Sequence, residues 1–370
     1  MADEVDPAVT LAPQASVEAV ATLLGWYRAQ HRELPWRQTT DPYRIWLSEI
    51  MLQQTQVVTV IPYYRRFLER YPTVQALAAA DLDELLALWQ GLGYYARARS
   101  LRRAAQLICE RHDGQVPASH QALLALPGIG AYTAGAILSI AFGQAVAAVD
   151  GNVKRVLARW FDLTLDSTSL AARRWFAEMA QRLLPPETSG DYNQAMMELG
   201  ATICTPRSPA CGACPLNDVC LACMRGTIAQ RPVLPPRRQV PTRILVAAHC
   251  VHDGRLLIVR RPPSGLLGGL WELPNWELSP AAEPVAALQT ALQAHATAAQ
   301  VGAPLTVARH AYTHFAVQMH VLSCTLTAFD PADTWDAVHW LARDELERYG
   351  LTGVTLKAIR NGPWLMPRLL

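Results

Sequence analysis

The sequence predicts two domains: a mostly α-helical domain followed by a smaller α+β domain. The length of 370 residues, of which 51% are hydrophobic, exceeds the roughly 100–200 residues of one ordinary domain. Over 17–225, apolar residues recur every three or four positions, as they do in amphipathic helices. After a proline-rich segment over 226–240, residues 241–370 contain runs with a period of two, which favours strands. We therefore expect a helical domain, a linker and an α+β domain over these three ranges.

The composition excludes several classes of protein. Residues 1–16 contain neither a basic segment nor a long apolar core, so we expect a flexible tail rather than a targeting signal. The most apolar stretch, 135–149, is interrupted by Ser139 and Gln144 and is too short to cross a bilayer. A net charge of +2 does not by itself indicate nucleic-acid binding, which requires clustered basic residues. The sequence predicts a globular protein without a membrane helix.

Glu49 lies on a predicted helix that begins at Asp41-Pro42, a pair typical of an N-cap and a first helical residue. Its neighbours on the same helix face are mainly apolar: Ile45, Trp46, Leu52 and Gln53. A carboxyl group against such a surface has a raised pKa and keeps a proton near neutral pH, as a general acid requires. The alternative is an exposed glutamate at the edge of the apolar stripe.

A glycine-containing turn, Leu126-Pro127-Gly128-Ile129-Gly130, separates two helices, of which the second begins near Ala131. Such a turn leaves backbone N–H groups uncovered at a helix N-terminus, where they can bind a phosphate oxygen of DNA. Gly128 and Gly130 are therefore candidate DNA-binding residues. The alternative is an ordinary turn between two helices.

Four of the eight cysteines lie within seventeen residues, in the order Cys204-x6-Cys211-x2-Cys214-x5-Cys220. Four thiolates at this spacing suit a tetrahedral metal site or an iron–sulfur cluster. Disulfides are an alternative, but nothing in the sequence indicates export to an oxidising compartment. Zinc is the competing occupant, and Cys223 could complete a different set of four. Spacing alone does not decide between these occupants.

The second domain begins with two predicted strands, 243–252 and 255–261, joined by a turn at Asp253-Gly254. Further on, residues 313–321 alternate apolar and polar side chains, as a strand with one solvated face does. The histidines near this strand keep no recognisable metal-site spacing with a carboxylate or a cysteine. We therefore expect a mixed α and β domain without a metal site at these histidines.

Taken as a set, these motifs resemble the adenine DNA glycosylases of the MutY type, in the helix-hairpin-helix, iron–sulfur DNA glycosylase superfamily. The glycine turn followed by Val149-Asp150-Gly151-Asn152-Val153 matches the superfamily's hairpin and downstream catalytic aspartate. Leu34-Pro35-Trp36-Arg37, ahead of the Glu49 helix, matches the adenine glycosylases in particular. The resemblance extends from about Leu34 to the strand at His320.

The resemblance implies four catalytic residues: Glu49, Asp150, Tyr132 and Asn152. Glu49 would protonate adenine, Asp150 would be the catalytic aspartate, and Asn152 would be its polar neighbour. Asp150 can also cap the helix that follows it, and the two roles can coexist. Tyr132 stands where relatives that also cut the strand carry lysine. Because tyrosine cannot form an imine, we expect a monofunctional glycosylase with at most weak lyase activity.

The resemblance also implies a cofactor and a set of DNA contacts. The expected cofactor is a 4Fe-4S cluster, bound by Cys204, Cys211, Cys214 and Cys220, with Cys223 outside the pattern. Gln54 would wedge beside the opposite base and Tyr94 would intercalate. The full set of expected DNA-binding residues is Arg37, Gln54, Leu92, Tyr94, Gly128, Gly130, Thr313 and His314.

The C-terminal domain resembles the Nudix-like domain of the same family. Residues 268–274 match the opening of a Nudix box, but 288–293 lack the carboxylates that would bind magnesium. Tyr312-Thr313-His314 matches the loop with which the family reads 8-oxoguanine, and an amphipathic strand with a solvated histidine is the alternative. We therefore expect a lesion-recognition domain without hydrolase activity.

The expected function is removal of adenine opposite 8-oxoguanine or guanine in duplex DNA, by acid-assisted hydrolysis of the N-glycosidic bond. We expect a monomer that binds mispaired duplex DNA and no membrane, in a cytoplasm of the bacterial type. The alternatives are a glycosylase-lyase for oxidised pyrimidines, a Nudix pyrophosphatase and a non-catalytic iron–sulfur DNA sensor. Tyr132 and the second domain count against the first, and the missing carboxylates count against the second.

Overall fold

The structure, a computed structural model, describes residues 13–236, 240–279, 281–312 and 314–365, except for the side chains of 13–16. Most of the expected tail lies outside these residues, and the first helix begins at Pro13 rather than at Val17.

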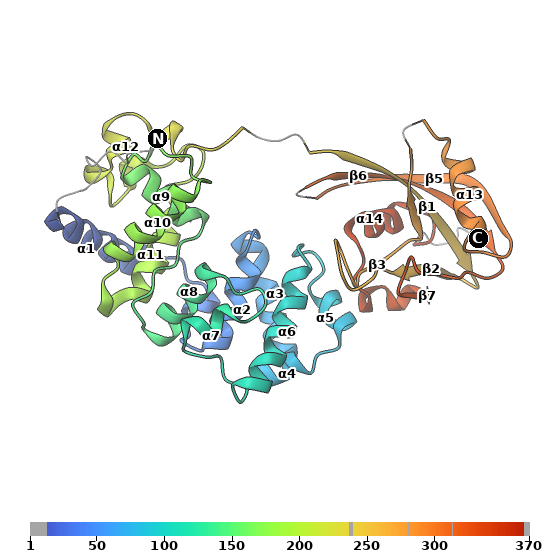
Figure 1. Ribbon diagram of the computed structural model, residues 1–370, viewed down its shortest axis with the longest axis horizontal. Coiled ribbons are helices and arrows are strands. Elements are labelled where there is room, and N and C mark those ends of the chain that lie inside the picture. Colours follow the sequence, from blue (N-terminus) through green and yellow to red (C-terminus); the bar gives the residue numbers. More distant parts are fainter. Residues whose placement is uncertain (1–12, 237–239, 280, 313, 366–370) are drawn as a thin grey trace. The chain divides into compact units, whose positions relative to one another are not determined.

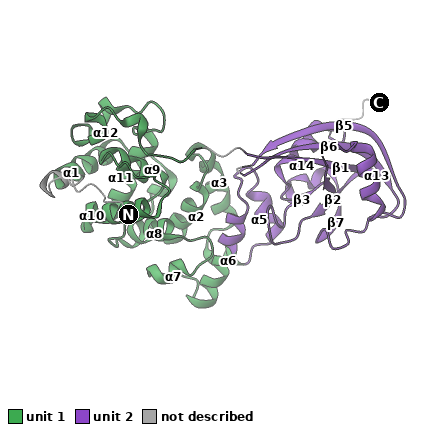
Figure 2. Cartoon of the chain, turned by 45° about the horizontal axis from the view of Figure 1, so that its top comes forward, with its two compact units in different colours: residues 1–78, 103–237 green, residues 79–102, 238–370 purple. Residues whose placement is uncertain are grey.

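Two compact units make up the chain (Figure 2). The first combines Met1–Ala78 with Arg103–Arg237, and the second combines Ala79–Arg102 with Arg238–Leu370. The first unit is helical and the second contains a mixed sheet (Figure 1), so the predicted fold class is confirmed. The sequence placed Ala79–Arg102 in the helical domain, whereas these residues pack with the C-terminal part of the chain.

The first unit is built from helices that run from blue to yellow in Figure 1. Its α-helices are α1 (Pro13–Gln30), α2 (Pro42–Leu52), α3 (Val57–Arg70), α4 (Val74–Ala78), the second part of α6 (Ala96–Arg111), α7 (His120–Leu124), α8 (Ala131–Phe142), α9 (Gly151–Trp160), α10 (Leu170–Leu183), α11 (Ser189–Thr202) and α12 (Leu221–Met224). Short 3-10 helices are η2 (Pro35–Arg37), η3 (Pro186–Thr188), η4 (Cys211–Ala213), η5 (Asn217–Val219) and η6 (Ile228–Gln230). Large aromatic residues from α9, α10 and α11 form the centre of one core, among them Trp160, Phe176 and Tyr192.

The helix starts expected from the sequence are confirmed. Asp41 caps α2 by accepting a hydrogen bond from the N–H of Tyr43 at 2.8 Å. Helix α8 begins at Ala131 after the glycine turn, with Gly130 as its N-cap. These starts position Glu49 on α2 and Tyr132 on the first turn of α8.

The second unit contains α5 (Leu82–Leu88), whose N-cap is Asp81, the first part of α6, and a sheet in the order β3-β2-β1-β6-β5. Strand β4 also pairs with β1, and β7 with β2. The remaining elements are β1 (Thr242–His252), β2 (Arg255–Arg260), β3 (Trp271–Glu272), β4 (Asn275–Glu277), α13 (Pro284–Gln293), β5 (Ala299–Ala311), β6 (Ala316–Leu326), β7 (Ala337–Leu341), η7 (Arg343–Arg348) and α14 (Gly353–Asn361). The predicted hairpin at Asp253-Gly254 is confirmed by antiparallel pairing of β1 with β2.

Strands β1 and β6 are parallel neighbours whose two faces are covered by different helices. Val246 and Leu322 pack with Leu288 of α13, whereas Ala247 and Met319 belong to the core that includes α14. The alternation expected for 313–321 is confirmed over its described residues: Phe315, Val317, Met319 and Val321 are buried, and the residues between them are more exposed. Beyond Val321 the alternation ends, because Leu322 is buried against α13.

Residues 226–236 of the expected linker pack within the first unit. Arg231 forms an ion pair with Asp162 at 2.7 Å, and both side chains are largely buried. The carbonyl of Val233 accepts hydrogen bonds from the N–H and Oγ of Ser167 at 3.0 and 2.8 Å. Among the described helices, none combines the length and the apolar character needed to cross a membrane.

Helices α9 and α11 approach each other closely at Gly200, where an added Cβ would lie 2.5 Å from the Cβ of Asn152. We expect Gly200→Ala to lower the free energy of unfolding by about 1–3 kcal/mol, because overpacking forces the helices apart. Gly25→Ala on α1 is the control, since no atom lies within 4 Å of its added Cβ. It should raise stability by roughly 0.5–1 kcal/mol. Chemical unfolding followed by circular dichroism measures both, and equal loss in the two variants would contradict the close approach.

Candidate active site

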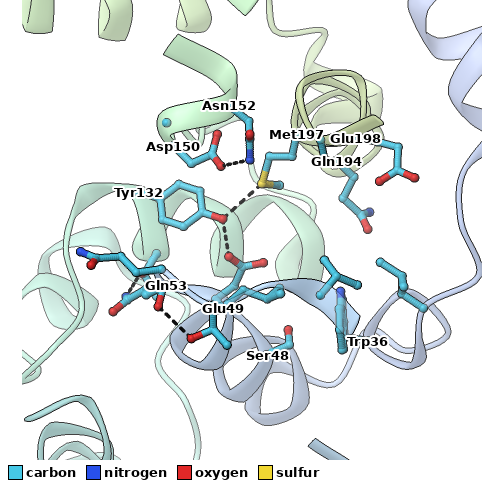
Figure 3. A pocket seen from close by; sticks show the side chains of 18 of the residues that line it. Trp36, Ser48, Glu49, Gln53, Tyr132, Asp150, Asn152, Gln194, Met197 and Glu198 are labelled. Atoms are coloured by element: carbon cyan, nitrogen blue, oxygen red, sulfur yellow. Dashed lines mark hydrogen bonds between the residues drawn. The ribbon is translucent and has the colours of Figure 1, made fainter. Parts of the chain in front are cut away.

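A cavity of about 1110 Å³ opens in the first unit and is lined by residues from α2, α8, α9 and α11 (Figure 3). Glu49, Tyr132, Asp150 and Asn152 all line it, so the structure brings together the four residues predicted to be catalytic. Trp36 and Ile45 supply part of an apolar wall. The space is large enough to hold a planar base, with polar groups gathered on one side.

Glu49 lines this cavity, with 5% of its surface exposed. Burial and the charge of Asp150 together raise the pKa of Glu49 to about 7, against a hydrogen bond from Tyr132 and the charge of Arg37, which lower it. The Tyr132 hydroxyl lies 2.5 Å from Glu49 Oε2. Glu49 can therefore carry a proton at neutral pH, as its apolar helix face predicted.

The hydroxyl of Tyr132 has a second neighbour, the Sδ of Met197 on α11, at 3.2 Å. A phenol has one proton to donate, and a carboxylate oxygen is a much stronger acceptor than a thioether. Tyr132 therefore donates to Glu49 while Glu49 is ionised, and Met197 offers another acceptor when Glu49 is protonated. Figure 3 shows the three side chains meeting at the cavity wall.

Asp150 is held at the N-terminus of α9. Its Oδ1 accepts from the N–H of Val153 at 2.7 Å, and its Oδ2 accepts from the Nδ2 of Asn152 at 2.8 Å. Burial raises the pKa of Asp150 above its ordinary value, although these hydrogen bonds and the charge of Arg155 oppose that shift and favour the carboxylate. The capping role and a place in the cavity wall coexist at this residue.

Arg155, which the sequence analysis did not identify, connects the cavity to the cysteine loop. Its guanidinium donates to Asn152 Oδ1, to the carbonyl of Gly200 and to the carbonyl of Cys204, each at 2.8 Å. Asn152 is thereby held from both sides, since its Nδ2 donates to Asp150. Arg155 follows Asn152 by three residues on a helix, a spacing that indicates a shared face.

A second missed group is Glu198 on α11, which is 1% exposed and lines the same cavity. Arg32 binds both of its oxygens at 2.7 and 2.8 Å, and Arg37 binds Oε2 at 2.8 Å. Burial alone would raise the pKa of Glu198, but the hydrogen bonds from Arg32 and Arg37 outweigh it and lower the pKa to about 2. Arg37, expected to bind DNA, is thus part of the cavity wall.

The four cysteines expected to bind the cluster line one small cavity together with Cys223 and the apolar residues Ile203, Pro209 and Ile228. Burial raises the pKa of Cys214 to about 12 and that of Cys220 to about 11, so positive metal centres are needed to hold these thiols as thiolates. Arg159 of α9 lies beneath the loop and donates to the carbonyl of Thr205 at 2.7 Å. Within the described ranges, no three Cys, His, Asp or Glu side chains converge on the position of a single metal ion. The all-thiol donor set fits an iron–sulfur cluster.

Apart from Arg37, the predicted DNA contacts of the first unit lie at its surface turns. Gly128 has a φ of 80°, a left-handed conformation that glycine adopts without strain. Gly130 caps α8 without a side chain, and no atom lies within 4 Å of an added Cβ there. Gln54, directly after α2, is exposed at the rim of the cavity and has a φ of 57°. Backbone amides and an exposed amide side chain are thus available at these positions.

The remaining predicted contacts belong to the second unit. Tyr94 is 40% exposed, and Arg97 lies over its ring at 5.6 Å. Leu92 is only 4% exposed, so its side chain offers little surface for DNA. His314 is exposed, whereas Thr313 lies outside the described residues.

The region corresponding to the incomplete Nudix box has a structural role. On α13, Leu288 and Leu292 are buried in the core of the second unit. Gln289 donates to the carbonyl of Ala299 and accepts from the N–H of Val301, at 2.9 and 3.1 Å. At the positions where a Nudix box has magnesium-binding carboxylates, this chain has side chains that pack in the core or hydrogen bond to a strand.

Comparison with known proteins identifies three regions of the chain. Residues 47–182 match the HhH-GPD superfamily of base excision DNA repair proteins, and 246–361 match the NUDIX domain. Residues 204–220 match the iron–sulfur binding domain of endonuclease III, which begins and ends at the outer two predicted ligands.

The chain matches two adenine DNA glycosylases along most of their length. That of Rattus norvegicus is 38% identical over 91% of this chain and 76% of its own, and that of Homo sapiens is 37% identical over 92% and 73%. The chain belongs to the adenine DNA glycosylase family. The resemblance inferred from the motifs is confirmed, and this glycosylase has the helix-hairpin-helix and Nudix regions expected of it.

Solved structures agree with the fold of the helical part of the glycosylase. A thermostable thymine-DNA glycosylase superposes with a TM-score of 0.54 at 30% identity, covering 58% of this chain and all of the other. A non-covalent endonuclease III–DNA complex gives 0.51 at 25% identity, covering 59% and 99%.

The ion pairs of Glu198 should contribute strongly to stability. We expect Glu198→Gln to lower the free energy of unfolding by about 3–5 kcal/mol, because it leaves Arg37 buried without a charged partner. Asp191→Asn is the matched control, since the Arg28–Asp191 pair is exposed and worth about 0–1 kcal/mol. Urea unfolding at neutral pH measures both, and equal losses would rule out a special role for Glu198.

Proposed function

We propose that this glycosylase removes adenine paired with 8-oxoguanine or guanine in duplex DNA, and leaves an abasic site without cutting the strand. The observation that supports it is a single cavity with two carboxyl groups in different environments. Burial raises the pKa of Glu49 to about 7, whereas Asp150 accepts two hydrogen bonds that favour its ionised form. Acid-assisted loss of a base needs one proton donor and one anion at such positions.

The reaction begins with adenine rotated out of the helix into the cavity, which costs a few kcal/mol and costs less for a mispaired base. Protonated Glu49 transfers its proton to N7 of the purine. The N-glycosidic bond then breaks, its electron pair stays with adenine, and neutral adenine departs. Glu49 is left as a carboxylate, to which Tyr132 donates a hydrogen bond.

Asp150 acts on the sugar. As the bond breaks, positive charge develops on the sugar ring, and an ionised carboxylate beside it lowers the energy of that state. Asn152 and the N–H of Val153 keep the carboxylate in place. Water then adds to the sugar cation and loses a proton, which yields the abasic site.

The absence of strand cleavage follows from Tyr132. A phenol cannot form the imine on which lyase chemistry depends. Lys154 also lines the cavity and is the source from which a weak, adventitious imine could arise. Residual cleavage without alkali should therefore disappear in Lys154→Ala.

Recognition of the duplex involves both units. The amides at Gly128 and Gly130 would bind a phosphate, while Gln54 and Tyr94 would enter the duplex near the mispair. His314 and Thr313 would read 8-oxoguanine through hydrogen bonds. When bound at the four cysteines, a 4Fe-4S cluster supplies the iron–thiolate bonds that hold the loop over 204–220 folded.

The test uses labelled duplexes containing one A:8-oxoguanine, A:G or A:T pair, treated with or without alkali after incubation. We expect alkali-dependent cleavage at the adenine of the first two duplexes and none with A:T. Glu49→Gln should reduce the single-turnover rate by about 10²–10⁴-fold. No product from wild-type protein that holds its full complement of iron would contradict the proposal.

The pH dependence follows from the raised pKa of Glu49. The active form is the protonated acid, so the single-turnover rate should fall as pH rises through about 7. Tyr132→Phe removes a hydrogen bond that lowers this pKa, and the midpoint should therefore move to higher pH. Tyr43→Phe, whose buried hydroxyl donates to the carbonyl of Tyr71, is the control and should leave the midpoint unchanged. A midpoint that does not move in Tyr132→Phe would show that Tyr132 does not tune the acid.

A further inference from the structure

A fifth thiol lies in the cavity of the cysteine loop. Cys223, on α12, lines the same space as Cys204, Cys211, Cys214 and Cys220. It lies beyond the residues 204–220 that match the iron–sulfur binding domain. A set of four ligands leaves it without an assigned role, although its donor atom faces the same space as theirs.

The position of Cys223 is well defined. Its backbone N–H donates to the carbonyl of Cys220 at 3.0 Å, and its Sγ lies 3.2 Å from the Oδ1 of Asn217. The amide oxygen of Asn217 is an acceptor, so the contact requires a protonated thiol as its donor. Cys223 is thus held at the edge of the ligand set by two hydrogen bonds.

Cys223 adjoins some of the four predicted ligands more closely than others. Its side chain hydrogen bonds with Cys211, and its backbone N–H hydrogen bonds with the thiol of Cys220. No such contact links it to Cys214, whose sulfur accepts from the backbone of Leu216. Cys223 thus adjoins Cys211 and Cys220, and of these two contacts the one with Cys211 is between side chains.

The sequence spacing also makes Cys223 a candidate member of the ligand set. Cys211-x2-Cys214-x5-Cys220 can be completed by Cys204 upstream or by Cys223 downstream. Removal of Cys211 still leaves four thiols around the cavity: Cys204, Cys214, Cys220 and Cys223. Four thiolates are the donor set that a 4Fe-4S cluster requires.

We propose that Cys223 is a reserve ligand of the iron–sulfur cluster, which binds the iron of Cys211 when that thiolate is lost. In the exchange, the Cys223 thiol gives its proton to water and its sulfur forms one bond to the iron that Cys211 has vacated. No electron is transferred, and the number of iron–sulfur bonds is restored. The proposal depends on cluster binding and is independent of adenine excision.

The test compares Cys211→Ala, Cys223→Ala, the double variant and Cys214→Ala in the full chain, purified without oxygen. Iron, acid-labile sulfide and the visible absorption of the cluster are measured per chain. Cys223→Ala and Cys211→Ala should both hold a cluster. The double variant and the matched control Cys214→Ala should hold at least about ten-fold less iron, since each lacks a reachable fourth thiolate.

Alkylation of Cys223 provides a second readout. In the wild-type protein its free thiol should react with iodoacetamide, and in loaded Cys211→Ala it should be protected, as judged by mass spectrometry of the peptide. Equal iron in Cys211→Ala and the double variant would overturn the proposal. So would an insoluble, iron-free Cys211→Ala chain, because a working reserve ligand would keep the loop folded.

Discussion

The start of α9 positions both the Asp150 carboxylate and the cysteine loop of this glycosylase. Asp150 is the N-cap of this helix, and its two carboxylate oxygens are held by Val153 and Asn152. One turn further on, Arg155 binds Asn152 and the carbonyl of Cys204. A displacement of the cysteine loop would therefore also displace the Asp150 carboxylate, because Arg155 and Asn152 connect the two. The same helix start explains why Gly200 faces Asn152, since any larger residue would separate α11 from α9.

Three carboxyl groups line one cavity, and their surroundings give them different properties. Glu49 is buried with a single hydroxyl as its donor, and its pKa rises to about 7. Glu198 is buried to a similar extent, but its ion pairs with Arg32 and Arg37 lower its pKa to about 2. Asp150 accepts from a backbone amide and a side-chain amide. Solvation and hydrogen bonding, rather than residue type, thus give the three carboxyl groups different affinities for a proton.

Much of this arrangement could be predicted from the sequence because it depends on local rules. The cap at Asp41, the glycine turn and the apolar face around Glu49 all follow from neighbours within one or two helical turns. The cysteine spacing is likewise local. Motif resemblance then brought Asp150 and Tyr132 to the same site, and the structure places both in one cavity.

The parts that escaped prediction depend on contacts between distant segments. Glu198 has the sequence of an ordinary helical glutamate, and its partners Arg32 and Arg37 lie far away in the chain. The segment over 226–236 has the composition of a linker, yet Arg231 anchors it to Asp162. Strand β6 alternates along part of its length only, because α13 and α14 cover opposite faces of its sheet. Composition and periodicity do not report such partners.

The central claim is that the cavity keeps Glu49 protonated near neutral pH beside an ionised Asp150. Titration of the carboxyl groups by carbon-13 NMR, in protein labelled at the glutamate side chains, tests it most directly, with Glu49→Gln used to assign the signal. The account predicts one glutamate carboxyl that titrates near pH 7 and is missing from the variant. A Glu49 signal with a midpoint at or below 4.5, the ordinary glutamate value, would contradict it.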